Sequence, residues 1–591
     1  MSAARPSARV AAAGAEDGLR PLPRVRVTYE EGRPAAPAPE ARVVPAAAGR
    51  VRLLLGALLS VFCLLTLRLA HVSFGMEEEL SVLRARAEDR TRPEVVDRRG
   101  RPLVMNRTTR GLGIDGRDVW DVEETVRAVT ALFPAANAER MRARLSDRAY
   151  AFVADDITDA QRARVVALGL PGMRFPEGSA RVYPQGPLAP HVLGYTIPGR
   201  GGATGVERAL DQARGAGEGR VRLTLDAQVQ RVLEAEIAGA IETFSARAGW
   251  GVLMDARDGA VVALASLPHY DPNAPGGAPA DARRNRALSD VYELGSAFKP
   301  LTVAAAMEAG LVDGRERFAV AEPIEVGDWS IRDYSPKSEP LTASEILQYS
   351  SNIGTVRIAE RLGAEGFAAM LDDLGLAAPL RTDMGRHRRP LLPARWGPAE
   401  LATASYGHGL AVSPVALTAA FAAVVNGGER VAPRFFEDTE PERTRVFSEE
   451  TSTALRLALR RVLTDGTGRN AEARGYHAIG KTATADKPGA GGYDGERLVS
   501  SFVGAFPGYD PAYVLLVSLD EPQGIPETYG FATAGYTAAP VFRRVVERAA
   551  PMLGVMPVGD AVAFDGFVGL RRGDEPRGLD ALARLLEEAA S

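Results

Sequence analysis

Residues 250–267, with the sequence WGVLMDARDGAVVALASL, decide the fold of the larger part of this chain. Two apolar runs flank Asp258-Gly259, a dipeptide that favours the tight turn of a β-hairpin. A second hairpin is predicted between residues 502–506 and 514–517, with residues 508–513 as its turn. Because hairpins pair strands antiparallel and helical patterns fill most of the sequence between them, we expect an α+β unit in which helices pack on an antiparallel sheet.

The length of 591 residues is too great for a single core, so at least two folded units are expected. Residues 221–225 alternate as a strand, and Asp226 is placed to cap the helix that follows. We therefore predict one α+β domain over residues 75–218, a second domain over residues 219–555 and a C-terminal tail over residues 556–591.

The N-terminal residues predict a membrane anchor. Residues 1–50 are rich in Ala, Pro and Arg, a composition that predicts a disordered tail. The apolar stretch that follows predicts a transmembrane helix over residues 51–74, if Arg68 reaches the interface. A cleaved signal peptide and a buried core helix are the alternatives, and the long preceding tail disfavours the first. Nine arginines against five acids through Arg52 put the tail in the cytoplasm and the rest of the chain outside the inner membrane.

The overall composition excludes several classes of protein. A formal charge of −4 gives no general attraction to nucleic acid. Cys63 is the single cysteine, and the six histidines have no ligand spacing, so we expect neither disulfides nor a metal site. No cofactor is predicted.

Lysine is rare in this chain. Of 71 basic residues, 67 are arginines and four are lysines: Lys299, Lys337, Lys481 and Lys487. A desolvated lysine can lose its proton near neutral pH, whereas arginine cannot. The rare lysines are therefore candidate functional groups, although accidental retention explains any single one equally well.

Ser296-Ala297-Phe298-Lys299 opens a predicted helical segment that runs to about Gly310. Residues at i and i+3 share a helix face, so Lys299 can reach the Ser296 hydroxyl and serve as the base that activates it. The Ser-x-x-Lys pattern is weak alone. It is strengthened by Ser350-Ser351-Asn352 and by Lys481-Thr482-Ala483-Thr484 further along the chain.

With these three elements the chain resembles the class B penicillin-binding proteins, and most closely the septal, FtsI-type D,D-transpeptidases. Further segments look like landmarks of that family. They are residues 292–296 (YELGS), 406–409 (YGHG), 426–428 (NGG), 520–522 (DEP), 92–93 (RP), 97–100 (DRRG), 181–184 (RVYP) and 191–194 (HVLG). The resemblance implies a penicillin-binding, serine β-lactamase-like transpeptidase domain, with helices on both faces of its sheet, behind an anchor and an elongated α+β pedestal of the dimerisation type.

The resemblance also implies the reaction and the role of each site residue. Ser296 would be acylated by the penultimate D-Ala of a stem peptide or by a β-lactam, with Lys299 as base. Ser350 would relay a proton and Asn352 would hold the substrate amide. Lys481, Thr482 and Thr484 would bind the terminal carboxylate, and the backbone amides of Ser296 and Thr484 would form the oxyanion hole. The implied partners are an FtsW-type glycosyltransferase and other division proteins.

Ala483 stands where the family has glycine. Residues 481 and 483 share one face of a strand, so the extra methyl is expected to point into the catalytic cleft and narrow it.

Other interpretations of the same sequence remain. Residues 475–482 match the phosphate-binding P-loop, but their flanks supply neither the preceding apolar strand nor the following helix. An elongation-type class B enzyme and a catalytically weakened scaffold or β-lactam sensor are the alternatives on the same fold, and a β-lactamase would need neither anchor nor pedestal.

Overall fold

The computed structural model describes residues 53, 55–66, 68 and 92–558, except residues 198–199, 215–218, 328 and 490–491. It divides the chain into two units, Met1–Glu77 and Glu78–Ser591. In the first unit, residues 55–66 are helical. No helix within the described ranges is both long and apolar enough to cross a membrane. The predicted tail over residues 1–50 lies outside the described residues, as do parts of the predicted segments 51–74 and 556–591.

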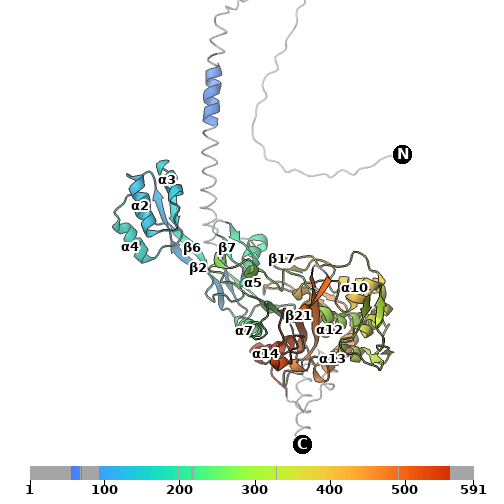
Figure 1. The fold of residues 1–591 in the computed structure, drawn as a ribbon. Coiled ribbons are helices and arrows are strands. Elements are labelled where there is room, and N and C mark those ends of the chain that lie inside the picture. The colour runs from blue at the N-terminus through green and yellow to red at the C-terminus, as the bar shows by residue number, and fades with distance from the viewer. Residues whose placement is uncertain are drawn as a thin grey trace, which may run out of the picture. The chain divides into compact units, whose positions relative to one another are not determined.

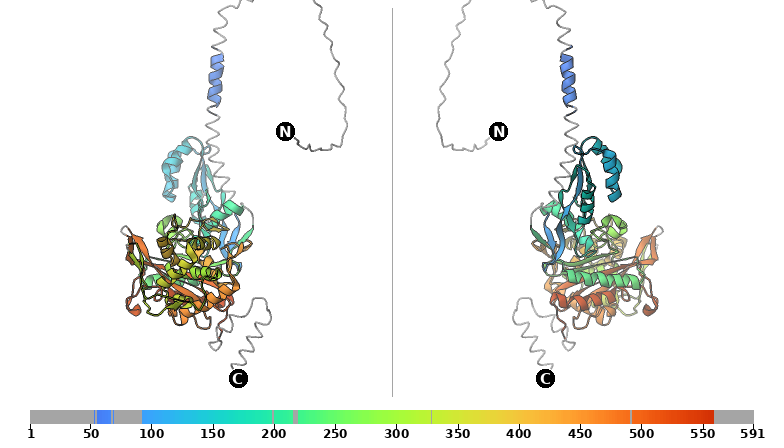
Figure 2. Two further views of the ribbon diagram at one scale, coloured as in Figure 1. Left: turned by 90° about the vertical axis from the view of Figure 1, so that its right-hand side faces the viewer. Right: turned by 90° about the vertical axis from the view of Figure 1, so that its left-hand side faces the viewer.

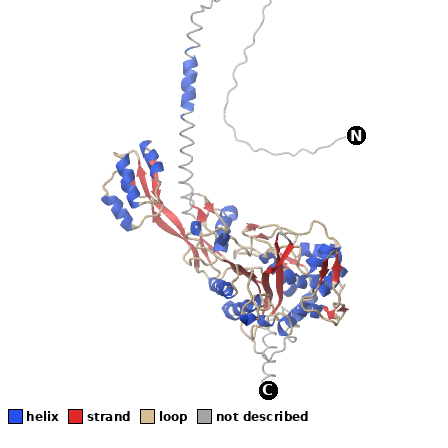
Figure 3. Cartoon of the chain, viewed as in Figure 1, coloured by secondary structure: helices blue, strands red, loops and turns tan. Residues whose placement is uncertain are grey.

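A five-stranded antiparallel sheet in the order β11-β10-β22-β21-β20 forms the centre of the larger unit (Figures 1 and 3). Its strands are β10 (Ala248–Asp255), β11 (Val261–Leu267), β20 (Ile479–Gly489), β21 (Gly492–Phe506) and β22 (Tyr513–Asp520). Both predicted hairpins are confirmed, as β10–β11 and as β21–β22. Every residue of β10, β11 and β22 is buried, because helices cover both faces of the sheet.

On one face, α7 (Ala227–Thr243) and α14 (Ala538–Ala549) pack against each other and on the strands (Figure 2). The predicted cap is confirmed, since Asp226 Oδ1 accepts hydrogen bonds from the backbone of Gln228 and Val229. On the other face lie α8 (Lys299–Glu308), α12 (Pro414–Val425) and α13 (Glu449–Thr464), of which α12 packs on β10, β21 and β22 and α13 on β20. Apolar residues of these helices and of the sheet belong to one hydrophobic core.

A helical region beside α8 completes this domain. Its helices are α9 (Ala343–Tyr349), α10 (Asn352–Asp373) and α11 (Pro398–Ser405). Short two-stranded sheets lie in the connections between the helices from α8 to α13. They pair β12 (Arg317–Phe318) with β15 (Leu341–Thr342) and β13 (Ile324–Val326) with β14 (Trp329–Ile331) before α9, β16 (Arg381–Thr382) with β17 (Gly385–Arg386) before α11, and β18 (Glu429–Val431) with β19 (Arg443–Arg445) before α13. Because α8, α9 and α10 pack on one another, they bring distant parts of the sequence together.

The pedestal precedes this domain and has two sheets of three or more strands, besides one short pair of strands. One has the order β6-β2-β1-β9, formed by β1 (Glu94–Val96), β2 (Pro102–Arg110), β6 (Glu177–Val182) and β9 (Arg220–Arg222). The other has the order β4-β3-β5, formed by β3 (Leu112–Asp115), β4 (Tyr150–Ala154) and β5 (Met173–Arg174). It has its own apolar core with α2 (Val122–Leu132), α3 (Ala138–Ser146) and α4 (Asp159–Ala167). Short elements α5 (Pro190–Leu193), β7 (Thr196–Ile197), β8 (Gly201–Gly202) and α6 (Gly205–Ala209) lead back toward β9.

The joint between the pedestal and the larger domain runs through β9. This strand pairs in parallel with β1 of the pedestal, and the next residue, Leu223, pairs with Phe436 of the larger domain. Asp97, which is fully buried, accepts a hydrogen bond from the backbone of Ala227 at the start of α7. Asp226, also fully buried, forms an ion pair with Arg99. These contacts join the two domains and do not mark a border between them. The predicted boundary between residues 218 and 219 therefore stays a prediction.

Candidate active site

Ser296 lies in a single 3-10 turn, Gly295–Phe298, from which α8 continues at Lys299. The predicted helical segment from Ser296 to about Gly310 therefore begins as a tighter turn and ends two residues early, at Glu308. Gly295 has a φ of +49°, and a Cβ there would lie 3.0 Å from the carbonyl oxygen of Thr484. A side chain at residue 295 would thus be strained and would press β20 away from Ser296.

Ser350 lies in a break between two helices. It follows α9 in a left-handed conformation, with φ 61° and ψ 41°, and α10 begins two residues later with Ser351 as its N-cap. A non-glycine residue in this region is strained and persists where its surroundings hold it. Here Lys299 Nζ donates a 2.5 Å hydrogen bond to the Ser350 carbonyl oxygen.

Asp333 holds the other side of this break, and sequence reasoning missed it. Its carboxylate accepts hydrogen bonds from Ser351 Oγ at 2.6 Å and from the backbone of Asn352 and Ile353 at 2.5 and 3.0 Å. An acidic group that accepts the free N–H groups at the start of a helix stabilises that start. Asp333 therefore acts on the Ser-Ser-Asn element through the backbone of α10.

The Ser350 hydroxyl joins three predicted site residues. Its oxygen accepts hydrogen bonds from Lys481 Nζ at 2.8 Å and from Lys299 Nζ at 3.2 Å, and it donates to Ser296 Oγ at 3.2 Å. A serine hydroxyl has one donor and two acceptor sites, and all three are used. The predicted direct contact between Lys299 and Ser296 is not made in the described part of the chain, where the route between them passes through Ser350.

Both active-site lysines are fully buried. Burial lowers the pKa of Lys299 from 10.5 to about 7, against the opposing effect of the Asp333 carboxylate. Burial, together with the charge of Lys299, lowers the pKa of Lys481 well below its ordinary value. A neutral amine near pH 7 can accept a serine proton, as expected of Lys299. The expectation that Lys481 stays charged remains a prediction: burial opposes its charged form, whereas a carboxylate bound beside it would favour that form.

The remaining predicted residues lie on β20 and α10. Thr482 Oγ1 lies 2.7 Å from Thr467 Oγ1, and Thr484 Oγ1 accepts a 3.1 Å hydrogen bond from the backbone of Ala534. Asn352 Nδ2 donates to the carbonyl oxygen of Arg332. These three polar groups therefore have partners within the protein.

Ala483 lies on the same face of β20 as Lys481, as predicted, but its methyl is not at the cleft entrance. Only 2% of its surface is exposed, and it belongs to the main apolar core. The expectation that it narrows an open cleft is therefore wrong, because packing beneath the site buries this face of the strand.

The P-loop interpretation of residues 475–482 is excluded. Ile479 to Gly489 form the edge strand β20, so the lysine is followed by a strand and not by the helix that a phosphate site requires.

Ser296 is joined through Ser350 to two buried lysines, in a domain whose antiparallel sheet has helices on both faces. This arrangement is that of a serine acyltransferase. The family described as "Penicillin binding protein transpeptidase domain" matches residues 249–547, and "Penicillin-binding Protein dimerisation domain" matches residues 88–233. The chain belongs to the penicillin-binding proteins, and specifically to their class B.

Individual relatives agree with this assignment. The chain is 37% identical to the probable peptidoglycan D,D-transpeptidase FtsI of Caulobacter vibrioides, over 80% of this chain and 83% of the relative. It is 28% identical to the peptidoglycan D,D-transpeptidase FtsI of Escherichia coli K12, over 80% and 85% of the two chains. Penicillin-binding protein 3 of Mycobacterium tuberculosis, in complex with aztreonam, has a similar structure, with a TM-score of 0.63, 25% identity, and coverage of 79% of this chain and 97% of the other.

Proposed function

We propose that this chain is a peptidoglycan D,D-transpeptidase that cross-links stem peptides during septal cell-wall synthesis. The observation that carries the proposal is the Ser350 hydroxyl, which bonds to Ser296 Oγ and to both buried lysines. This arrangement provides a proton route from a nucleophile to a base whose pKa is about 7.

In the first half-reaction, the Ser350 hydroxyl turns so that it accepts from Ser296 and donates to neutral Lys299, the reverse of the hydrogen bonds described above. Ser296 Oγ then attacks the carbonyl carbon of the penultimate D-Ala, and its proton passes through Ser350 to Lys299. The C–N bond to the terminal D-Ala then breaks, and the leaving amine takes a proton back along the same route. In the second half-reaction, a neutral amine of a neighbouring stem peptide attacks the ester carbonyl and forms the new C–N bond. The C–O bond to Ser296 breaks, and the proton lost by the amine returns to Ser296 Oγ through Lys299 and Ser350. No cofactor is consumed, since the energy of the broken amide is kept in the ester.

Three further groups complete the proposed site. The negative oxygen of each tetrahedral intermediate would lie between the backbone N–H groups of Ser296 and Thr484, and each such donor typically contributes about 3 kcal/mol. The close approach of Gly295 to Thr484 supports this role. The substrate carboxylate would bind Lys481, Thr482 and Thr484, and its charge would raise the pKa of Lys481 again.

The septal role is favoured over an elongation role because the relatives named above are FtsI proteins. We further propose a single-pass anchor in the inner membrane with the catalytic domain in the periplasm, beside an FtsW-type glycosyltransferase and other division proteins along the pedestal. The apolar run over residues 53–67 behind an arginine-rich tail supports the anchor.

Labelling with fluorescent penicillin, followed by peptide mapping, tests the proposed function. We expect one covalent adduct, on Ser296, and no labelling of Ser296→Ala. An adduct on a different serine, or undiminished labelling of the variant, would refute the assignment of the nucleophile.

A further inference from the structure

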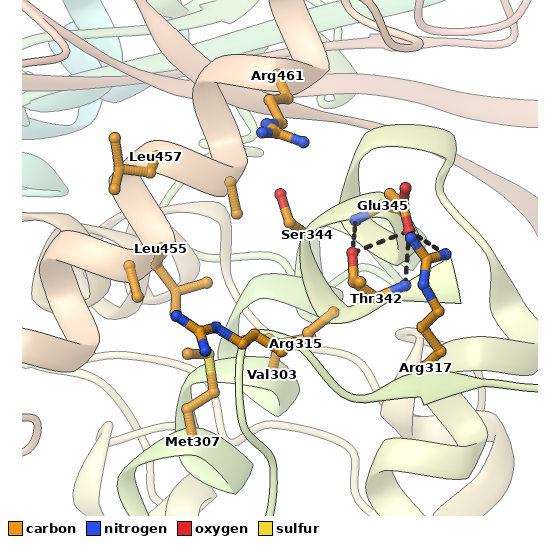
Figure 4. Close-up of a pocket in the computed structure, with 14 residues that line it drawn as sticks. Val303, Met307, Arg315, Arg317, Thr342, Ser344, Glu345, Leu455, Leu457 and Arg461 are labelled. Atoms are coloured by element: carbon orange, nitrogen blue, oxygen red, sulfur yellow. Dashed lines mark hydrogen bonds and ion pairs between the residues drawn. The ribbon is translucent and has the colours of Figure 1, made fainter. Parts of the chain in front are cut away.

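A pocket with a volume of about 510 Å³ opens between α8, α9 and α13, and none of its lining residues belongs to the Ser296 network (Figure 4). Its floor is apolar. Val303 and Leu455 are almost completely buried there, whereas Leu457 at the mouth keeps 37% of its surface exposed. Ala454, Leu457, Ala458 and Arg461 follow helical spacing along one face of α13.

The polar lining of the pocket has an excess of positive charge. Three of its residues are arginines and one is an acid, Glu345. Glu345 is already engaged, because it accepts hydrogen bonds from the backbone and hydroxyl of Thr342 and from Arg317. In the described part of the chain, neither Arg315 nor Arg461 lies within ion-pair distance of a carboxylate, although the charge of Arg461 acts on Glu345 and that of Arg315 on Asp313. Figure 4 shows the two arginines on opposite sides of the pocket. An apolar floor between two guanidinium groups that form no direct ion pair complements an apolar side chain flanked by carboxylates.

Two of the helices that line the pocket also carry or adjoin the catalytic residues Lys299 and Ser350. Val303 and Met307 lie on α8, which begins at Lys299. Thr342 to Glu345 lie at the start of α9, which is followed directly by Ser350. The third lining helix, α13, packs on both of these helices. A ligand that contacts α8 and α9 together therefore acts on the relative positions of Lys299 and Ser350, because each helix moves as a rigid element.

We propose that this pocket binds an acidic peptide segment of a partner protein and that binding changes the rate of acylation at Ser296. A leucine-sized side chain of the peptide lies on Val303 and Leu455, and flanking carboxylates bind Arg315 and Arg461. The binding itself is independent of the function proposed above, whereas its effect on acylation rests on that function.

The test uses the full-length protein and a fluorescein-labelled peptide of sequence EDLLED, with EDSSED and RKLLKR as matched control peptides. Binding is followed by fluorescence anisotropy. We expect EDLLED to bind with a Kd below about 1 mM and both controls to bind at least about tenfold more weakly. Arg461→Glu removes a positive charge that binds a peptide carboxylate, and Leu457→Asp removes apolar surface that contacts the peptide leucines. Each variant should therefore weaken binding by about tenfold. Arg389→Glu, the same change at an exposed arginine outside the pocket, should leave binding unchanged.

Penicillin labelling is then measured with and without saturating peptide. A change in labelling rate of at least about twofold in the unaltered protein, absent in Arg461→Glu, supports the proposal. Binding of EDLLED that Arg461→Glu and Arg389→Glu weaken equally overturns it, as does no binding at all. Binding without a change in labelling rate overturns the coupling.

Other occupants give different results. If Arg461→Glu changes the labelling rate without any peptide, the pocket acts on Ser296 without a partner and the partner assignment is wrong. If Leu457→Asp converts a dimer into a monomer, the occupant is a second copy. A protein that binds EDLLED as expected but is never labelled at Ser296 refutes the proposed function and leaves the docking intact.

Discussion

Acylation of Ser296 should increase about tenfold between pH 6 and pH 8 and then level off. The reacting form of Lys299 is the neutral amine, so the rate follows the fraction of Lys299 that has lost its proton. Burial lowers the pKa of this lysine to about 7, and the curve should therefore have its midpoint there.

The increase in labelling rate between pH 6 and pH 8 shows whether the pKa of Lys299 is lowered or ordinary. With a pKa of about 7, about one-tenth of Lys299 is neutral at pH 6, about half at pH 7 and about nine-tenths at pH 8. With the ordinary pKa of about 10.5, the rate would instead rise about a hundredfold over the same range, without a plateau. The Asp333 carboxylate raises the pKa of Lys299, so Asp333→Asn should move the midpoint to lower pH.

The assay is the second-order rate of labelling by fluorescent penicillin, measured from about pH 5.5 to about pH 9 with the melting temperature recorded at each pH. Lys299→Arg should abolish labelling throughout, because a guanidinium group does not lose its proton in this range. Lys487→Arg is the matched control, since Lys487 bonds to Asp520 and Glu521 and not to the Ser350 network. It should keep the profile of the unaltered protein.

A rate that is independent of pH across this range would refute the role of Lys299 as base. So would a rate that still rises tenfold per pH unit at pH 9, because the lysine would then keep its ordinary pKa. A midpoint that moves to higher pH in Asp333→Asn would show that the sign of the electrostatic argument is wrong.

Three further predictions follow from the same structure. Lys481→Arg should lower labelling without abolishing it, because a guanidinium group can still donate to Ser350 Oγ, and a loss as complete as that of Lys299→Arg would remove the distinction between the two lysines. Ala483→Gly should lower the stability by about 1–2 kcal/mol, seen as a lower melting temperature, and leave the labelling rate within about twofold, because the methyl is buried in the core; faster labelling at unchanged stability would contradict this. A reporter enzyme that works only outside the inner membrane should be active when fused after Ser591, and activity of a cytoplasm-only reporter there would contradict the proposed anchor.

Much of the fold could be predicted because its signals are local. The turn at Asp258-Gly259 and the Asp226 cap each depend on a few adjacent residues, and both are present as predicted. The order β11-β10-β22-β21-β20 could not be read from the residues alone, because β10 pairs with a strand about 260 residues further along the chain. The helices on both faces came only from the resemblance to a family.

The active site likewise has residues that a local sequence pattern reveals and residues that only the fold reveals. Lys299 and Lys481 could be found because lysine is rare in this arginine-rich chain, and Ser296 because it lies three residues before Lys299. Ser350 came from the resemblance to the family, and the structure brings all four together. Asp333 could not be found, because an aspartate in a loop has no pattern of its own and its role appears only when α10 begins beside it. The outcome at Ala483 depended on which face of β20 is covered, and that is decided by packing.

The joint at β9 has a mechanical consequence for the molecule. A flexible tether would let the catalytic domain swing freely, but here β9 is bonded on one side to β1 and continues at Leu223 into a pairing with Phe436. Buried Asp97 and Asp226 lock the start of α7 to the same place. Bending at this joint would have to break a strand pairing and expose two buried carboxylates, both costly in free energy. A force applied to the pedestal sheet would therefore be transmitted through β9 to the start of α7.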